Sequence, residues 1–269
     1  MRRRDRASVI SAKQWGIVLA LLFLSVTNGR GTTIAVVIQP SLITVAADSA
    51  RTLEDLTGAR SVVSECKVHL LNGFLFLEAG IMRNDETKFY PLELAQSAAI
   101  SSGNTTAAMA SLRASLLERL PDVVANVRRR NSPAYQRWVK GNVPIITVLF
   151  GAVPAGGITT ATLCQFLLAG NEIKPDCSAA VKNFAWMMGT NKTATFLFTT
   201  NPTAFGNSAA RNPVDFVRSI VELEIATSRL LNTGDVGAPI SIARFDVTGL
   251  HFIERGVCPA DQGNKQNNK

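Results

Sequence analysis

The sequence lacks the residue spacings that typically bind structural metals. Its four cysteines form no Cys-x-x-Cys pair, and its two histidines, His69 and His251, stand far apart. Structural zinc sites are usually recognised by such closely spaced cysteine and histidine ligands. We therefore expect no metal site, and no residue pattern indicates a cofactor.

Charged side chains are also scarce, at 18% of residues against 46% hydrophobic ones. A chain of 269 residues with this composition can bury a large core and is expected to be globular. Its net charge of +8 is unevenly distributed, because residues 1–31 carry six of the 28 basic side chains and one of the 20 acidic ones. The remainder has a net charge of only +3, which does not favour nucleic-acid binding.

Residues 1–31 have the layout of an export signal. An arginine-rich start is followed by an apolar run from Trp15 to Val26 and by small polar residues that end at Gly31. Twelve apolar residues are fewer than the roughly 20 that span a bilayer as a helix, so we expect a removable leader cleaved at Gly31/Thr32. The mature protein would then be exported, periplasmic or secreted, and would meet a membrane only through this leader. A retained N-terminal anchor is the alternative.

The cysteines allow one local pairing. If the chain is exported, Cys164 and Cys177 are close enough in sequence to form a disulfide. Free buried thiols are the alternative for this pair, and Cys66 is expected to be an ordinary core residue.

The first fifty residues after the leader predict an antiparallel meander. Two β-branched runs, 33–38 and 42–47, flank a Gln-Pro-Ser turn, as in a hairpin. A third strand is expected over 64–71, and Asn72-Gly73 connects it to a fourth over 74–77. Asn-Gly between apolar runs is among the best local hairpin signals.

The rest of the chain predicts helices and then strands again. Asn104 or Thr105 can cap a helix over 107–120, which Pro121 is expected to interrupt before a basic segment that ends at Arg130. Asn212-Pro213 begins a helix that continues to Leu231, with proline at the first helical position. The expected strands are 143–150, 158–168, 195–200, 239–245 and 249–254.

The order of these elements indicates the fold class. Strands and helices come in groups, without the alternation of a parallel sheet, which favours an α+β protein with antiparallel sheets packed on each other and helices outside. We expect a four-layer α/β/β/α sandwich formed by one domain over residues 32–257. Residues 258–269 would be a polar C-terminal tail.

One set of residues resembles the proteasome β-type subunits, which are N-terminal-nucleophile (Ntn) hydrolases. The likeness begins with Gly31-Thr32-Thr33-Ile34-Ala35-Val36 and Val45-Ala46-Ala47-Asp48-Ser49. It continues through Glu65-Cys66-Lys67, Ala79-Gly80 and the closing Gly237-Ala-Pro-Ile-Ser segment. As a pattern of elements it covers residues 32 to about 257, although the specific residues cluster near the start.

The resemblance implies a role for each matched residue. Thr32 would be the nucleophile, exposed when the chain is cut after Gly31, and Thr33 is the alternative nucleophile. Asp48 would orient the site and pair with Lys67, which would help to hold the threonine deprotonated. The backbone N–H of Gly80 would bind the developing oxyanion.

Elementary chemistry explains why cleavage matters for such a site. A threonine hydroxyl is a weak nucleophile and needs a base. A free α-amine on the same residue can serve, because its pKa lies near 8. An oxyanion donor contributes about 3 kcal/mol to such reactions.

The sequence also departs from the family. An aspartate and a serine usually brace the threonine from the turn before the last strands; here Asp235 can substitute for the aspartate, and the serine has no clear counterpart. Alignment on Ala35 would put Gly31 at the nucleophile position, whereas alignment on Asp48 puts Thr32 there, and the chemistry requires a hydroxyl.

The functional expectation is a threonine-type endopeptidase or other amide hydrolase that acts on a peptide or protein substrate. The resemblance further implies a homo-oligomer. The alternative is a protein with the same fold that is catalytically inactive and serves a structural or binding role.

Overall fold

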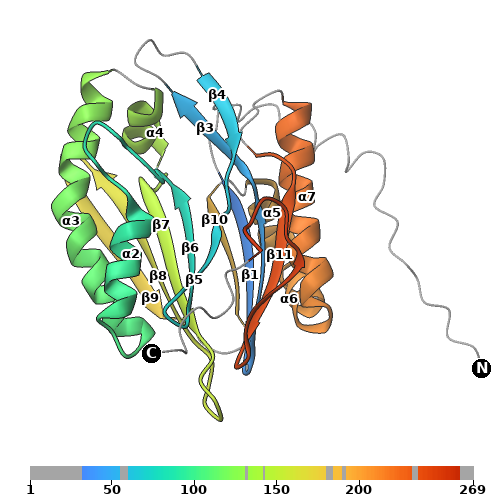
Figure 1. The fold of residues 1–269 in the computed structure, drawn as a ribbon. Helices are drawn as coiled ribbons and strands as arrows, with labels where there is room; N and C mark the ends of the chain where they lie inside the picture. The colour runs from blue at the N-terminus through green and yellow to red at the C-terminus, as the bar shows by residue number, and fades with distance from the viewer. Residues whose placement is uncertain are drawn as a thin grey trace, which may run out of the picture.

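Two five-stranded antiparallel sheets form the centre of the structure (Figure 1). The computed structural model describes residues 32–54, 60–130, 133–141, 143–179, 184–189, 192–231 and 236–260. The first sheet has the strand order β10-β1-β2-β11-β12, and the second has the order β5-β6-β7-β8-β9. A separate two-stranded ribbon, β3-β4, extends from one end.

The strands of the first sheet are β1 (Thr33–Gln39), β2 (Leu42–Asp48), β10 (Phe184–Gly189), β11 (Ile240–Asp246) and β12 (Gly249–Glu254). The strands of the second sheet are β5 (Val68–Leu71), β6 (Phe74–Gly80), β7 (Ile146–Ala152), β8 (Thr160–Ala169) and β9 (Glu172–Ala179). The ribbon consists of β3 (Ala50–Glu54) and β4 (Arg60–Ser64).

Helices cover the outer face of each sheet (Figure 1). On the second sheet lie α2 (Pro91–Ile100), α3 (Thr105–Arg129) and α4 (Pro133–Gly141). On the first sheet lie α5 (Lys192–Thr200), α6 (Pro202–Arg211) and α7 (Pro213–Leu230). No helix in the described part of the chain is long and apolar enough to span a membrane.

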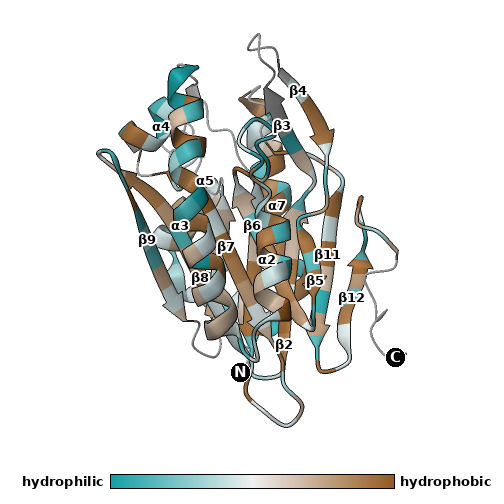
Figure 2. Ribbon diagram, turned by 60° about the vertical axis from the view of Figure 1, so that its left-hand side comes forward, coloured by the Kyte–Doolittle hydropathy of each residue, from teal (hydrophilic) through white to brown (hydrophobic). Residues whose placement is uncertain are grey.

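Apolar side chains of the described residues pack into three cores. The central core lies between the sheets and contains Ile34, Val36, Leu75, Leu77 and Leu149, all fully buried. A second core joins the helices α2 and α3 to the second sheet, and a third joins α5 to α7 to the first sheet. Because both faces of each sheet are covered, the inner strands are apolar along most of their length, whereas the edge strand β9 is largely hydrophilic (Figure 2).

Much of the sequence-based fold prediction is confirmed. The chain is α+β with antiparallel sheets, and β1 and β2 form the expected hairpin, in which Val36 lies opposite Val45. Asn72 and Gly73 turn β5 into β6 with positive φ angles of 47° and 82°, as a tight hairpin turn requires. The Asn104 side chain caps α3 by accepting the N–H of Ala107 at 2.9 Å.

Two predicted elements are wrong. Residues 195–200 form part of the helix α5 rather than a strand. The Glu224 carboxylate of α7 accepts the N–H of Ala194 at 2.9 Å, so a distant residue satisfies the start of α5 in a way that local propensity cannot reveal. Pro121 does not interrupt α3, because the buried residues Leu120 and Val123 hold both sides of it against the sheet.

Other elements were missing from the prediction or had different bounds. The expected strand over 64–71 is divided between β4 and β5, and these belong to different sheets. The prediction did not include α2, α4, α6, β3, β9 or β10.

Both cysteine pairs form disulfides. Cys164 is bonded to Cys177, which is one of the two expected states, across directly paired positions of β8 and β9. Cys66 lies in the core between the sheets, as expected, but the prediction missed its bond to Cys258, 192 residues away. Sequence spacing cannot indicate a bond between residues that only the packing of two sheets brings together.

Candidate active site

Asp48, the last residue of β2, is the centre of a buried polar cluster near the start of β1. Its side chain is almost completely buried, with 1% of the residue exposed. Oδ1 accepts the backbone N–H of Thr33 at 2.7 Å and Nζ of Lys67 at 2.8 Å. Oδ2 accepts the backbone N–H groups of Ala50 at 3.1 Å and Gly237 at 3.2 Å. Four donors therefore fix the carboxylate in one orientation.

Lys67 lies between the end of β4 and the start of β5 and faces Asp48. Both side chains of this ion pair are fully buried. Nζ of Lys67 also donates to the carbonyl oxygen of Ala50 at 2.6 Å. A buried charge is tolerated only when it is paired and hydrogen-bonded, and this lysine has both kinds of partner.

Burial changes the acidity of both groups. It raises the pKa of Asp48, and the Lys67 charge and the hydrogen bonds to the carboxylate oppose that shift. Burial lowers the pKa of Lys67 below its ordinary value, and the Asp48 charge opposes that shift. Lys67 therefore releases a proton at a lower pH than an exposed lysine.

Backbone contacts hold the segments that carry the pair. The N–H of Glu65 donates to the carbonyl oxygen of Ser49 at 2.8 Å, and the N–H of Ser49 donates to the carbonyl oxygen of Gly237 at 3.1 Å. The side chains of Arg51 and Glu65 form an ion pair at 2.6 Å. These contacts hold the residues next to Asp48 against both the segment before Lys67 and the segment before β11.

Thr32 lies directly before β1 and is 5% exposed. Its neighbour Thr33 is opposite Gly189, the last residue of β10. A Cβ atom at Gly189 would lie 1.7 Å from the carbonyl oxygen of Thr32 and 3.4 Å from Cβ of Ala79. Only glycine fits at this point, where φ is +80°. The close approach brings the backbone of Thr32 next to the end of β6.

Gly80 ends β6 and is exposed. It has a φ of +107°, and a Cβ atom there would lie 2.5 Å from the carbonyl oxygen of Ile145. Glycine is therefore required by both conformation and space. Thr32, Asp48, Lys67 and Gly80 come from four separate segments, and the structure brings all four to the same end of the two sheets.

Glu78 is a polar residue of this region that sequence reasoning missed. It lies two residues before Gly80 on β6, is 2% exposed, and its Oε2 has no hydrogen-bond partner among the described residues. Burial raises its pKa to about 8, and nearby Glu65 adds to the shift. The available signal was a single acid inside an apolar strand, Phe-Leu-Phe-Leu-Glu-Ala-Gly.

Two other residues of the site were not assigned a role from the sequence. Gly189 has no local sequence signature. Glycine is required there because the carbonyl oxygen of Thr32, which is distant in sequence, lies too close for a Cβ atom. Gly237 was part of the matched pattern, but its N–H bond to Asp48 was not foreseen.

Gly31 and Asp235, the predicted cleavage site and bracing residue, lie outside the described residues. In the part of the chain that the structure describes, no group of three or more His, Cys, Asp or Glu side chains could hold a metal ion.

Comparisons with known proteins add a distant likeness. No family model matches the sequence, and no curated protein matches it. Among solved structures, the backbone is similar to that of the Anbu (Gly-1) mutant from Hyphomicrobium sp. strain MC1. The TM-score is 0.46 and the sequence identity 17%, over 83% of this chain and 87% of that chain. A likeness this distant leaves activity and assembly to be argued from the chain's own residues.

Proposed function

We propose that this chain is a threonine-type amide hydrolase that cleaves peptide bonds with Thr32 as its nucleophile. The observation that carries the proposal is the Asp48 carboxylate, which binds the N–H of Thr33 and Nζ of Lys67 through the same oxygen atom. The Lys67 ammonium is thereby held close to the start of β1, where it can stabilise negative charge that develops on the Thr32 hydroxyl oxygen.

The proposed chemistry begins with cleavage of the Gly31–Thr32 bond, which frees the α-amine of Thr32. The amine takes the proton of the Thr32 hydroxyl while Oγ1 attacks the substrate carbonyl carbon. The Lys67 ammonium lowers the cost of the negative charge that develops on Oγ1. Collapse of the tetrahedral intermediate breaks the amide C–N bond, and the leaving amine receives the proton. Water then hydrolyses the ester on Thr32 in the same way.

Two further groups would assist this sequence. The backbone N–H of Gly80 would donate to the oxyanion, a contribution of about 3 kcal/mol in comparable sites. Asp48 acts as a positioning residue, because it contacts Lys67 and the backbone of Thr33 rather than the substrate. Thr33 remains the alternative nucleophile if the chain is cut one bond later.

We also propose a fold family, a location and an assembly state for this chain. The two sheets and their helices would be the four-layer α/β/β/α sandwich of Ntn hydrolases, over residues 32–257. The two disulfides favour an oxidising compartment, in agreement with a leader over 1–31 that exports the chain. We further propose that the mature chain forms a homo-oligomer.

The direct test compares Thr32→Ala with Thr32→Ser in protein whose N-terminus has been determined by intact mass. Serine keeps a hydroxyl beside the α-amine, so Thr32→Ser should retain peptide hydrolysis, whereas Thr32→Ala should lose it. Circular dichroism establishes that both variants fold. A hydrolysis rate that is unchanged in Thr32→Ala would contradict the assignment, and a rate lost only in Thr33→Ala would transfer it to Thr33.

A second candidate is an inactive protein of the same fold with a structural or binding role. It is favoured by the 5% exposure of Thr32 and by the absence of a clear counterpart to the bracing serine. This candidate predicts that a chain beginning at Thr32 does not react with a peptide electrophile that modifies threonine hydroxyls. A covalent adduct on Thr32 would exclude it.

A further inference from the structure

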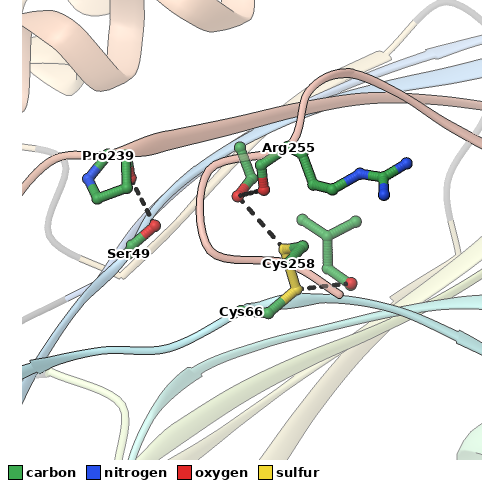
Figure 3. The surroundings of a disulfide bond; sticks show 7 residues. Ser49, Cys66, Pro239, Arg255 and Cys258 are labelled. Carbon is green, nitrogen blue, oxygen red and sulfur yellow. Dashed lines mark hydrogen bonds between the residues drawn. A yellow bond between two sulfur atoms is a disulfide. The ribbon is translucent and has the colours of Figure 1, made fainter. Parts of the chain in front are cut away.

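The disulfide Cys66–Cys258 lies directly beside the proposed catalytic lysine. Cys66 is the residue before Lys67, and Cys258 follows the last strand, β12. Figure 3 shows the bond spanning two segments that are far apart in the chain, with Ser49 and Pro239 nearby. Both cysteines are buried, at 9% and 5% exposure.

The disulfide connects the two sheets at the level of Asp48. Cys66 leads through Lys67 into β5 of the second sheet. Cys258 lies against the first sheet, where its Sγ is 3.3 Å from Oγ of Ser241 on β11. Ser241 is opposite Ala47 in the ladder, one position from the pair formed by Ile240 and Asp48. The disulfide and the Asp48–Lys67 ion pair therefore join the same two sheets side by side.

The ion pair needs such a restraint. Both of its side chains are fully buried, and buried charges lose hydration that only a well-held geometry can offset. Lys67 lies outside the regular strands, in the segment 65–67 between β4 and β5. Strand pairing therefore fixes Asp48 directly, but it fixes Lys67 only through its neighbours.

We propose that the Cys66–Cys258 disulfide is a positioning element that holds Lys67 on Asp48, so that activity depends on its oxidation. This inference rests on the proposed function. A dithiol reductant would break the S–S bond, supply two electrons and two protons to give two thiols, and itself become a disulfide. Reduction would release Lys67 from one side, solvate it more fully and weaken its alignment with Thr32.

The second disulfide provides a matched control in the same molecule. Cys164 and Cys177 are directly opposite each other on neighbouring strands of one sheet. The ladder of β8 and β9 holds them together without the bond, and these are the two strands of the second sheet farthest from β5, which follows Lys67. Its loss should leave Lys67 in place.

The test compares Cys66→Ala/Cys258→Ala with Cys164→Ala/Cys177→Ala in peptide hydrolysis. We expect the first variant to lose roughly a hundredfold in kcat, as misplacement of a reacting group does, with KM within about twofold of the wild type. Its kcat–pH profile should also move to higher pH, because a more solvated Lys67 has a higher pKa. The control variant should keep the wild-type kcat and pH profile. A loss of kcat without movement of the pH profile, or equal effects in both variants, would overturn the proposal.

A second measurement is independent of both hydrolysis and the folding of the variant. The native protein is treated with dithiothreitol, mass spectrometry identifies the reduced disulfide, and amide hydrogen exchange is followed where circular dichroism shows that the fold persists. We expect the Thr33, Ala50 and Gly237 amides, which donate to Asp48, to exchange at least about tenfold faster once Cys66–Cys258 is reduced. Unchanged exchange would overturn the positioning role. An oxidised wild type that does not hydrolyse peptides would instead contradict the proposed function.

Discussion

The two ends of the paired sheets are constructed differently. At one end, Asn72 and Gly73 form an ordinary hairpin turn, and a Cβ atom at Gly73 would meet nothing within 4 Å. At the other end lie the buried Asp48–Lys67 pair, the unpartnered Glu78 oxygen and the close approach of Gly189 to Thr32. The first end contains what the fold requires. The second end contains buried charges and tight contacts that the fold does not require. Functional sites commonly contain such features.

If the end that holds the Asp48–Lys67 pair depends on a covalent restraint, removal of the Cys66–Cys258 disulfide should have the largest effect on stability. The bond closes 192 residues, whereas Cys164–Cys177 closes 13. Chain entropy then gives about 5 kcal/mol for the first bond and about 3 kcal/mol for the second. Urea unfolding of the two double alanine variants measures both losses. A larger loss for the Cys164 and Cys177 variant would contradict this ranking.

Asp48→Asn tests whether the buried Asp48–Lys67 ion pair contributes both to stability and to peptide hydrolysis. The substitution removes a partner from a buried ion pair and should lower the free energy of unfolding by about 3–5 kcal/mol, with loss of peptide hydrolysis. Asp176→Asn, on the exposed edge strand β9, is the control and should change stability by less than about 0.5 kcal/mol. Similar unfolding midpoints for the two variants would show that the Asp48 charge has no special role.

Glu78 should make the protein less stable as the pH rises. Its pKa in the folded protein, about 8, lies above its ordinary value of 4.5. The folded chain thus keeps a proton that the unfolded chain releases, and stability should fall between these two pH values. Glu78→Gln should remove a fall on the order of 3 kcal/mol between pH 4.5 and 7.

The measurement is urea unfolding across this pH range, with Glu172→Gln on the exposed strand β9 as the control. Parallel stability curves for wild type and Glu78→Gln would contradict a neutral buried carboxyl. A curve for Glu172→Gln that follows the wild type is expected.

A glycine comparison gives the smallest expected effect. Gly189 and Gly73 have nearly the same positive φ, 80° and 82°, so alanine is strained at both positions. Only Gly189→Ala also collides with the carbonyl oxygen of Thr32, which should add about 1–3 kcal/mol of destabilisation. Thermal unfolding of the two variants measures the difference. Equal losses would mean that the approach of β10 to Thr32 is not a tight contact.

The sequence predicted the elements whose signals are local. The Asn-Gly turn, the Asn104 cap, the Asn212-Pro213 helix start and the closing hairpin each depend on a few adjacent residues. The element over 195–200 was mispredicted because a carboxylate from α7 satisfies the start of α5. Disulfide Cys66–Cys258 was missed for a related reason, since only sheet packing brings its two ends together.

The same division applies to the candidate site. Asp48, Lys67 and Gly80 could be selected because their types and order resemble a family pattern, and the ion pair between the first two lies as that pattern implies. Glu78 and Gly189 could not be selected, because their significance depends on burial and on the approach of another strand. Their roles become visible only in three dimensions.

The most direct test of the account is a covalent label on the mature protein. Protein whose intact mass corresponds to a chain beginning at Thr32 is treated with a peptide electrophile that esterifies hydroxyl nucleophiles, and the modified residue is mapped by mass spectrometry. The account predicts one adduct, on Thr32, together with loss of peptide hydrolysis in proportion to labelling. Hydrolysis that persists in fully labelled protein, or a chain that begins at Thr32 and takes no label, would contradict it.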